Sequence, residues 1–195
     1  MSTKAWLLGI LALVVVVVIA LIGYYNSFIN LNENVNQGWS QVESQYQRRS
    51  DLMGNLVETV KGITKQEQAV FLGVTEARAK AGQVDLSKIN DPAVFKQYQD
   101  AQQELAGSFS KMLVTVEAYP NLKSNENFLA LQSQIEGTEN RIATERMRYN
   151  EIATEYNKKA KAIPGVWFVN MAGLPSTRQL FQADAGAEKA PQVKF

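Results

Sequence analysis

The stretch RRSDLMGNLVETVKG, residues 48–62, carries charged and amide side chains at helical spacing. The polar row consists of Arg48, Asp51, Asn55, Glu58 and Lys61. Two carboxylates flanking a substrate are the groups that hydrolyse a glycosidic bond, and they then lie about 5–9.5 Å apart across a cleft. Asp51 and Glu58 are two helical turns apart, about 10 Å along one axis. The spacing therefore argues against a catalytic pair and favours a structural role for the row.

Composition narrows the possible chemistry further. The 195 residues include neither histidine nor cysteine, so imidazole and thiol catalysis are excluded and the commonest zinc ligands are missing. The formal net charge of +1 gives no case for nucleic acid as a partner. The sequence also has no nucleophile elbow, phosphate loop or cluster of metal ligands. We therefore predict a protein that is not an enzyme and that binds no cofactor or metal, with a hydrolase as the remote alternative.

An apolar run near the N-terminus can position the chain on a membrane. Residues 5–22 are uncharged, and about 20 such residues cross the ~30 Å hydrocarbon core of a bilayer. Tyr24 and Tyr25 follow where an aromatic belt meets the membrane interface. A cleaved signal peptide would have a shorter apolar region and a small-x-small cleavage site, and Leu21–Tyr24 is poor for cleavage. We predict an uncleaved, single-pass anchor in residues 1–27.

Basic residues around the run indicate its orientation. Lys4 precedes the run, and the next basic residue, Arg48, lies beyond the range that sets topology. This bias predicts that the N-terminus is cytoplasmic and that the remainder of the chain lies on the other side of the membrane. The lipid bilayer is accordingly an expected partner.

The rest of the chain is dominated by apolar residues at helical spacing. One stripe consists of Phe28, Leu31, Val35, Trp39, Val42 and Tyr46, and because no proline occurs before residue 92, the anchor helix is expected to continue into it. Asp91-Pro92 is a typical helix start, Tyr119-Pro120 ends that helix, and Ser124 is the expected N-cap of the next. The last long helix has a coiled-coil-like heptad stripe and ends at Pro164-Gly165. Long amphipathic helices with short connections predict an all-α, antiparallel helical bundle over residues 28–164.

Two segments follow the bundle. Residues 165–181 form a short apolar closing segment that is too short to span a membrane. It could pack on the bundle, dip into the membrane face or contact a neighbouring subunit, and Trp167 and Phe168 are its candidate contact residues. The last twenty residues lose the periodicity and gain Ala, Gly and charge, which predicts a mostly disordered tail, with residues 182–195 as the tail proper.

Several separated blocks give the chain a family resemblance. They are VNQGWS (35–40), RRSDLMGNLVETVKG (48–62), TEARA (75–79), VEAYPNLKSNENFLALQ (116–132), EGTENRIATERMRYN (136–150) and EYN (155–157). In this order and spacing the chain resembles the LemA family of bacterial single-pass membrane proteins, from the anchor to about residue 181. The resemblance implies a membrane helix followed by an antiparallel bundle, in the bacterial inner (cytoplasmic) membrane.

The resemblance implies a scaffold rather than an enzyme. Members of the family have no agreed molecular activity; some genes lie beside membrane zinc proteases, and a related branch is tied to shaping internal membranes in magnetic bacteria. Two departures from the family pattern occur here. Gly54 stands where the family usually has proline, which changes any kink, and Gln66-Glu67 stands where a His-Glu pair is frequent, which places a metal or proton role there in doubt.

A second polar line in the last long helix matches the first in its charge order. It comprises Glu139, Arg141, Glu145, Arg146, Asn150 and Asn157. Polar groups within a helical seam fix register and partner at a cost in stability. We predict a structural network in which Arg48, Arg49, Asp51 and Glu58 pair with Glu139, Arg141, Glu145 and Arg146. The same groups could instead bridge two subunits or form a solvated face.

These patterns together predict a non-enzymatic, membrane-anchored helical scaffold. It is expected to be a homo-oligomer that organises or remodels the cell envelope membrane. The alternative function is an adaptor or regulator of a membrane-bound protease in envelope stress.

Overall fold

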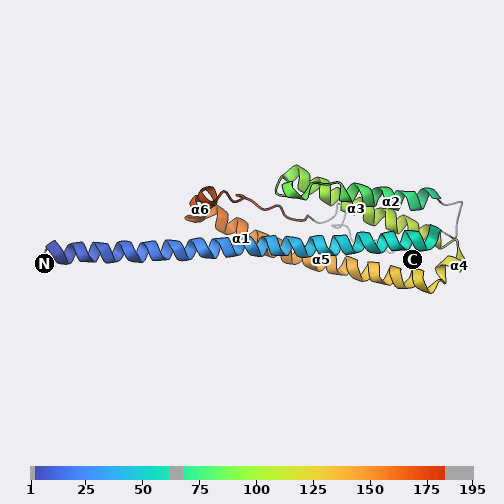
Figure 1. Ribbon diagram of the computed structural model, residues 1–195, viewed down its shortest axis with the longest axis horizontal. Coiled ribbons are helices and arrows are strands. Elements are labelled where there is room, and N and C mark those ends of the chain that lie inside the picture. Colours follow the sequence, from blue (N-terminus) through green and yellow to red (C-terminus); the bar gives the residue numbers. More distant parts are fainter. Residues whose placement is uncertain (1–2, 62–67, 183–195) are drawn as a thin grey trace, which may run out of the picture.

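The computed structural model describes residues 3–61 and 68–182. Gln66 and Glu67, where the sequence departs from the family pattern, lie outside these ranges. The elements are α1 (Thr3–Lys61), α2 (Gln68–Gly82), the 3₁₀ turn η1 (Leu86–Lys88), α3 (Pro92–Val116), α4 (Pro120–Lys123), α5 (Glu126–Lys161) and α6 (Gly165–Ala172). Every regular element in the described part of the chain is helical, which confirms the predicted all-α bundle (Figure 1).

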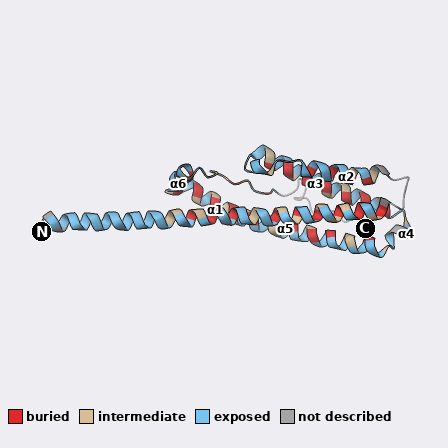
Figure 2. Ribbon diagram, viewed as in Figure 1, coloured by how far each residue is buried: buried red, intermediate tan, exposed pale blue. Residues whose placement is uncertain are grey.

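Helix α1 joins the anchor to the bundle without interruption. It runs for 59 residues, about 88 Å at 1.5 Å per residue. Its first part projects alone from the rest of the molecule, and the apolar side chains from Trp6 to Ile22 are exposed (Figures 1 and 2). Within the described residues it is the helix long and apolar enough to cross a membrane. The predicted continuation of the apolar run into the bundle as one helix is confirmed.

The four long helices alternate in direction. α1 runs away from the N-terminal end, α2 returns, α3 runs out again, and α5 returns along α1 (Figure 1). The Asp91 carboxylate accepts hydrogen bonds from the amides of Ala93 and Val94, which confirms the predicted start of α3. The prediction of Ser124 as the next N-cap is wrong by one residue: the Asn125 side chain accepts the hydrogen bond from the Phe128 amide.

Two apolar clusters form the core of the bundle. The distal cluster, farther from the anchor, contains Met53, Leu56, Leu105, Met112 and Ile135 among its most buried members. The membrane-proximal cluster contains Phe28, Val35, Val42, Ala153 and Tyr156. The stripe predicted from Phe28 to Tyr46 therefore does face the core, because one stripe per helix must be buried to stabilise a bundle. Ile163, the last position of the stripe predicted for the last long helix, is exposed because α5 ends before it.

The C-terminal segment completes the membrane-proximal cluster. α2 ends at Gly82 and so covers only the distal half of the bundle, and an extended segment, residues 174–182, lies beside α5 in the proximal half (Figure 1). Phe181 belongs to the buried core there. The expectation of a tail over the last twenty residues is therefore wrong for residues 176–182, which are held by hydrogen bonds from side chains of α5. Residues 183–195 lie outside the described ranges.

Candidate functional site

A Tyr-Asn doublet occurs twice in α5, at Tyr149-Asn150 and Tyr156-Asn157. The doublets are seven residues apart, so they lie on one helix face about 10 Å from each other. Three residues of extended chain also span about 10 Å. Because the two lengths agree, the two doublets can bind two residues that are three positions apart in an extended segment lying along the helix.

Each asparagine holds both backbone groups of one residue in the extended segment. Asn157 donates to the carbonyl oxygen of Arg178 at 2.9 Å and accepts from the amide of Arg178 at 2.7 Å. Asn150 makes the same pair of bonds to Phe181, both at 2.9 Å. Such paired bonds satisfy a strand's backbone in place of a neighbouring strand. We name residues 146–157 of α5 together with the held residues 174–182 the clamp.

The tyrosines and Arg146 add further bonds to backbone carbonyls. The Tyr156 hydroxyl donates to the carbonyl of Pro175 at 2.7 Å, and the Tyr149 hydroxyl donates to that of Gln179 at 3.0 Å. Arg146 donates to the carbonyl of Gln182 at 2.9 Å. All of these hydrogen bonds are made to the backbone of the segment, so they hold it in place whatever its side chains are.

Two side chains of the segment anchor it in the bundle. The Phe181 ring lies 5.0–5.9 Å from the rings of Phe95, Tyr149 and Trp39, and the Arg146 guanidinium lies 4.8 Å from its centre. Aromatic contacts of this kind contribute about 0.5–1.5 kcal/mol per pair beyond burial of area. Phe181 therefore fills the space that a fourth helix would occupy in the proximal half.

Arg178 is buried and is bound by amide side chains from distant parts of the chain. It donates to Asn32 at 2.6 Å, to Asn36 at 2.9 Å and to Asn90 at 2.9 Å. Its guanidinium also lies 5.4 Å from the centre of the Tyr156 ring. Because Asn32 and Asn36 belong to α1 and Asn90 precedes α3, Arg178 ties the segment to both helices as well as to α5.

Burial changes the acidity of the clamp tyrosines. It raises the pKa of Tyr149 to about 12, although the nearby Arg178 charge acts in the opposite direction. Burial likewise raises the pKa of Tyr156, against the effects of the Arg178 charge and a hydrogen bond. Both phenols are therefore neutral at physiological pH and available as the hydrogen-bond donors that the clamp uses.

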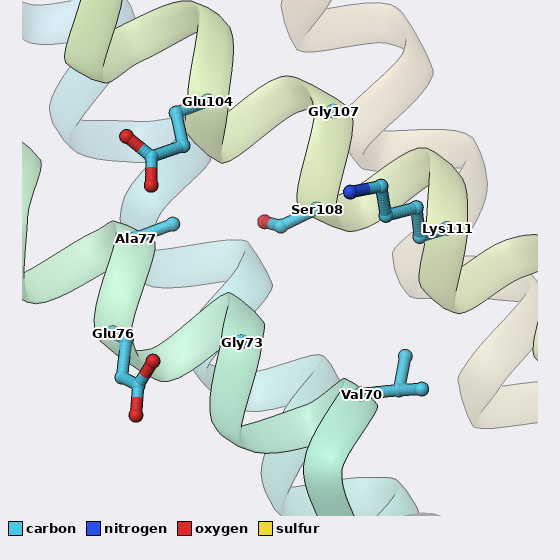
Figure 3. Close-up of a pocket in the computed structure, with 8 residues that line it drawn as sticks. All are labelled: Val70, Gly73, Glu76, Ala77, Glu104, Gly107, Ser108 and Lys111. Carbon is cyan, nitrogen blue, oxygen red and sulfur yellow. The ribbon is translucent and has the colours of Figure 1, made fainter.

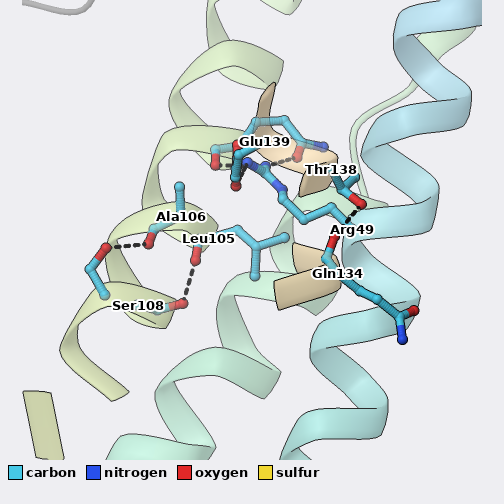
Figure 4. A network of polar contacts seen from close by, with 9 residues as sticks. Arg49, Leu105, Ala106, Ser108, Gln134, Thr138 and Glu139 are labelled. Carbon is cyan, nitrogen blue, oxygen red and sulfur yellow. Dashed lines mark hydrogen bonds and ion pairs between the residues drawn. The ribbon is translucent and has the colours of Figure 1, made fainter. Parts of the chain in front are cut away.

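A second polar site lies between the two apolar clusters along the bundle. Figure 4 shows Arg49, Thr138 and Glu139 of this site. The buried Arg49 donates to Glu139 at 2.7 Å and to the backbone and side-chain oxygens of Gln102 at 3.0 and 2.5 Å. Thr138, also buried, donates to the carbonyl of Gln134 at 2.7 Å. This layer joins α1, α3 and α5 at one level, and a polar layer inside a seam selects one register of the helices.

One of the predicted contacts between the two polar lines forms, and several of the other side chains have different partners. The structure brings Arg49 and Glu139 together, but Asp51 lies 3.5 Å from Arg78 of α2, and Glu145 pairs at 2.9 Å with Arg148 on its own helix. Arg48, Asn55, Glu58 and Arg141 are exposed. The predicted pairing of Arg146 across to α1 is replaced by its bond to the extended segment. Asn150 and Asn157, which the sequence places in the polar line, hold the extended segment rather than α1.

The sequence contains one signal for the clamp, and it is independent of the order of charges. The doublet YN recurs at a seven-residue interval within YNEIATEYN. An amide side chain repeated every seven residues of a helix matches the spacing of every third residue in an extended segment, since both distances are about 10 Å. Arg178 and Phe181 carry no comparable signal, because a strand held by side chains shows no periodicity of its own.

A trough lies between α2 and α3 (Figure 3). Its volume is about 490 Å³, and the missing or short side chains of Gly73, Ala77 and Gly107 leave the space between the two helices unfilled. Ser108 and Lys111 point into it (Figure 3). Among the described residues no group of three or more His, Cys, Asp or Glu could hold a metal ion.

The residues predicted to lie at the membrane interface meet in one place. The Phe168 ring of α6 lies 5.4 Å from the Tyr24 ring and 5.8 Å from the Tyr25 ring. Trp167, the other candidate contact residue, is exposed. α6 therefore packs on α1 directly after the apolar run.

Comparison with known sequences gives one family and several relatives. The sequence model of the LemA family matches residues 38–195. The magnetosome proteins MamQ 1 and MamQ 2 of Paramagnetospirillum magneticum are each 26% identical over 191 residues, covering 89% of this chain and 70% of theirs. Protein LemA of Metamycoplasma hominis is 22% identical over 138 residues, covering 71% of this chain and 60% of its own.

Proposed function

Since this chain belongs to the LemA family, we propose that it is a non-enzymatic, membrane-anchored scaffold that self-assembles and organises or remodels the bacterial envelope membrane. The observation that carries the proposal is the continuity of α1 from the exposed apolar run into the bundle core. A hinge between anchor and bundle would let the two move independently. An unbroken helix instead transmits any tilt of the bundle to the anchor, and the reverse.

Rigid coupling gives lateral contacts a mechanical effect. Anchoring confines the bundles to two dimensions, which raises their effective concentration and strengthens weak contacts between copies. When neighbouring bundles contact each other at a fixed angle, their anchors are held at the same angle. An array of such copies would impose curvature or order on the bilayer. The similarity to proteins named for the magnetosome supports this function over an adaptor or regulator of a membrane-bound protease.

We place the protein in the inner membrane with its N-terminus in the cytoplasm and the bundle on the other side. Lys4 before the span supports this orientation, since cytoplasmic flanks are enriched in basic residues. Single-cysteine labelling tests it, because the native chain has no cysteine. Leu129→Cys places an exposed thiol on α5 near its start, at the end of the bundle away from the anchor. An impermeant maleimide should label it in cells whose outer barrier is opened, and protection until the inner membrane is opened would reverse the orientation.

Reconstitution of the full chain tests the scaffold. We expect particles whose mass is a multiple of 21.7 kDa in detergent, and vesicles whose shape changes as protein density rises in cryo-electron microscopy. Ser27→Pro breaks the helix between anchor and bundle, whereas Ser27→Ala leaves it intact. The proline variant should stay folded and membrane-bound but lose the effect on vesicle shape.

The outcomes separate the scaffold from its alternatives. A monomer at every density, with unchanged vesicles, contradicts self-assembly. A monomer that co-purifies from cells with a membrane-bound protease supports the adaptor function instead. Equal vesicle remodelling by both Ser27 variants contradicts the rigid-coupling argument.

A further inference from the structure

Helix α6 is apolar on both of its faces. Its sequence, GVWFVNMA, contains Asn170 as its one polar side chain. Gly165 and Val169 are buried against the bundle. On the opposite side, Trp167 is 63% exposed and Met171 is 70% exposed. A helix that is hydrophobic all round is found buried in protein or in lipid. The outer face of α6 is exposed in the isolated chain, so an apolar partner is expected to cover it.

Three large apolar residues at α6 are exposed. Trp167 and Met171 are four residues apart on α6 and therefore lie on one side of it. Ile163, in the turn directly before α6, is 74% exposed. Single exposed apolar residues are common on soluble proteins, but contiguous apolar patches mark contact surfaces. We call these three residues the outer row.

The position of α6 identifies what the outer row contacts. Phe168 packs on Tyr24 and Tyr25, which directly follow the exposed apolar span of α1. Gly165 lies so close to Tyr24 that a Cβ there would be 3.1 Å from its hydroxyl oxygen. In Figure 1, α6 lies at the end of the bundle from which the anchor projects. The outer row is therefore at the level where α1 leaves the bilayer.

Charged residues beside the row fit the same surroundings. Lys158 and Lys161, in the last turn of α5, are exposed directly before α6. Tryptophan and tyrosine concentrate at membrane–water interfaces, and lysine extends its ammonium group to lipid headgroups. The composition around α6 thus combines an apolar face with a cationic rim.

We propose that α6 is an interfacial membrane helix whose outer row lies at the boundary between headgroups and acyl chains of the bilayer that α1 crosses. A single spanning helix can rotate about its own axis, but a second contact beside it fixes both rotation and tilt of the bundle. The proposal rests on the anchor of the proposed scaffold. It adds a second point of attachment that orients the surfaces through which copies would meet.

Site-directed spin labelling of the full chain in nanodiscs containing anionic lipid tests the proposal. Single cysteines replace Trp167, Met171, Val114 and Val14 in four separate variants of the cysteine-free chain. Val114, at the far end of α3, is 74% exposed and is the matched control for an exposed apolar site away from the membrane. Val14 lies in the middle of the exposed apolar run and reports the anchor itself.

Accessibility to oxygen and to a water-soluble nickel complex gives the depth of each label. We expect labels at 167 and 171 to show an oxygen-to-nickel ratio several-fold above that at 114 and below that at 14. A ratio at 167 and 171 equal to that at 114 would overturn the interfacial helix while a high ratio at 14 leaves the anchor intact. Low access to both reagents at 167, with spin–spin broadening between copies, would mean that a second copy covers the row and would also overturn the proposal. A low ratio at 14 would contradict the anchor and hence the proposed function.

Discussion

Removing one asparagine of the clamp gives a quantitative test of how the C-terminal segment is held. Asn157→Ala deletes the two hydrogen bonds to the backbone of Arg178, at 2.9 and 2.7 Å, and leaves α5 otherwise unchanged. Alanine is the best helix former, so the substitution does not weaken α5 itself. The expected effect is therefore confined to attachment of residues 174–182.

The magnitude follows from the number of bonds lost. Each hydrogen bond contributes about 0.5–1.5 kcal/mol net, so losing both costs about 1–3 kcal/mol of docking free energy. At 1.4 kcal/mol per factor of ten, the open population of the segment rises by about 5- to 140-fold. Asn150→Ala removes the equivalent pair of bonds to Phe181 and is expected to act in the same range.

Hydrogen–deuterium exchange of the full chain measures this population directly. The amides of Arg178 and Phe181 donate to Asn157 and Asn150 when the segment is docked. Local opening of the segment exposes both amides to solvent, so their exchange rates report the open population. Their exchange should accelerate by the factor given above, while amides of the distal cluster keep their protection. Asn140→Ala is the matched control, because Asn140 is an exposed asparagine on the same helix. If Asn157→Ala and Asn140→Ala exchange alike over residues 176–182, the clamp does not hold the segment.

Three other perturbations test separate parts of the structure. Arg49→Glu should lower the free energy of unfolding by about 3–5 kcal/mol, because it places an unpaired carboxylate at a buried position and removes the donor to the buried Gln102 and the partly exposed Glu139. Adding Glu139→Arg should restore part of the loss in denaturant titrations. Unchanged unfolding in the single variant would contradict the polar layer. Gly165→Ala should displace α6 and accelerate its amide exchange, because the new Cβ would collide with the backbone carbonyl of Lys159; unaltered exchange would show that α6 is not held there. The Tyr149 phenol should ionise near pH 12 rather than 10, seen as the tyrosinate absorbance lost in Tyr149→Phe. Because its folded pKa is raised, the fold favours the neutral phenol, so this stabilisation is complete below pH 10 and is lost as pH rises towards 12.

Sequence by itself determined the helices and the anchor. Helical hydrogen bonds join residues four apart, so a helix depends on residues that are near one another in the sequence. The apolar stripe from Phe28 to Tyr46 and the cap at Asp91 are two such local patterns. The apolar run is likewise a local property, since crossing a bilayer depends on length and composition. These features could be predicted because each depends on neighbours in the chain.

Only the tertiary structure decided which partners the polar side chains have. Glu139 and Asn157 lie on the same helix, yet one binds Arg49 and the other binds the backbone at Arg178. A hydrogen bond requires atoms within about 3 Å, and which segments come that close depends on how the whole bundle packs. Charge order along two helices does not contain that information, because a third segment can compete for the same groups. The extended segment, residues 174–182, is such a competitor, and its order comes from the α5 side chains that hold it rather than from any pattern of its own.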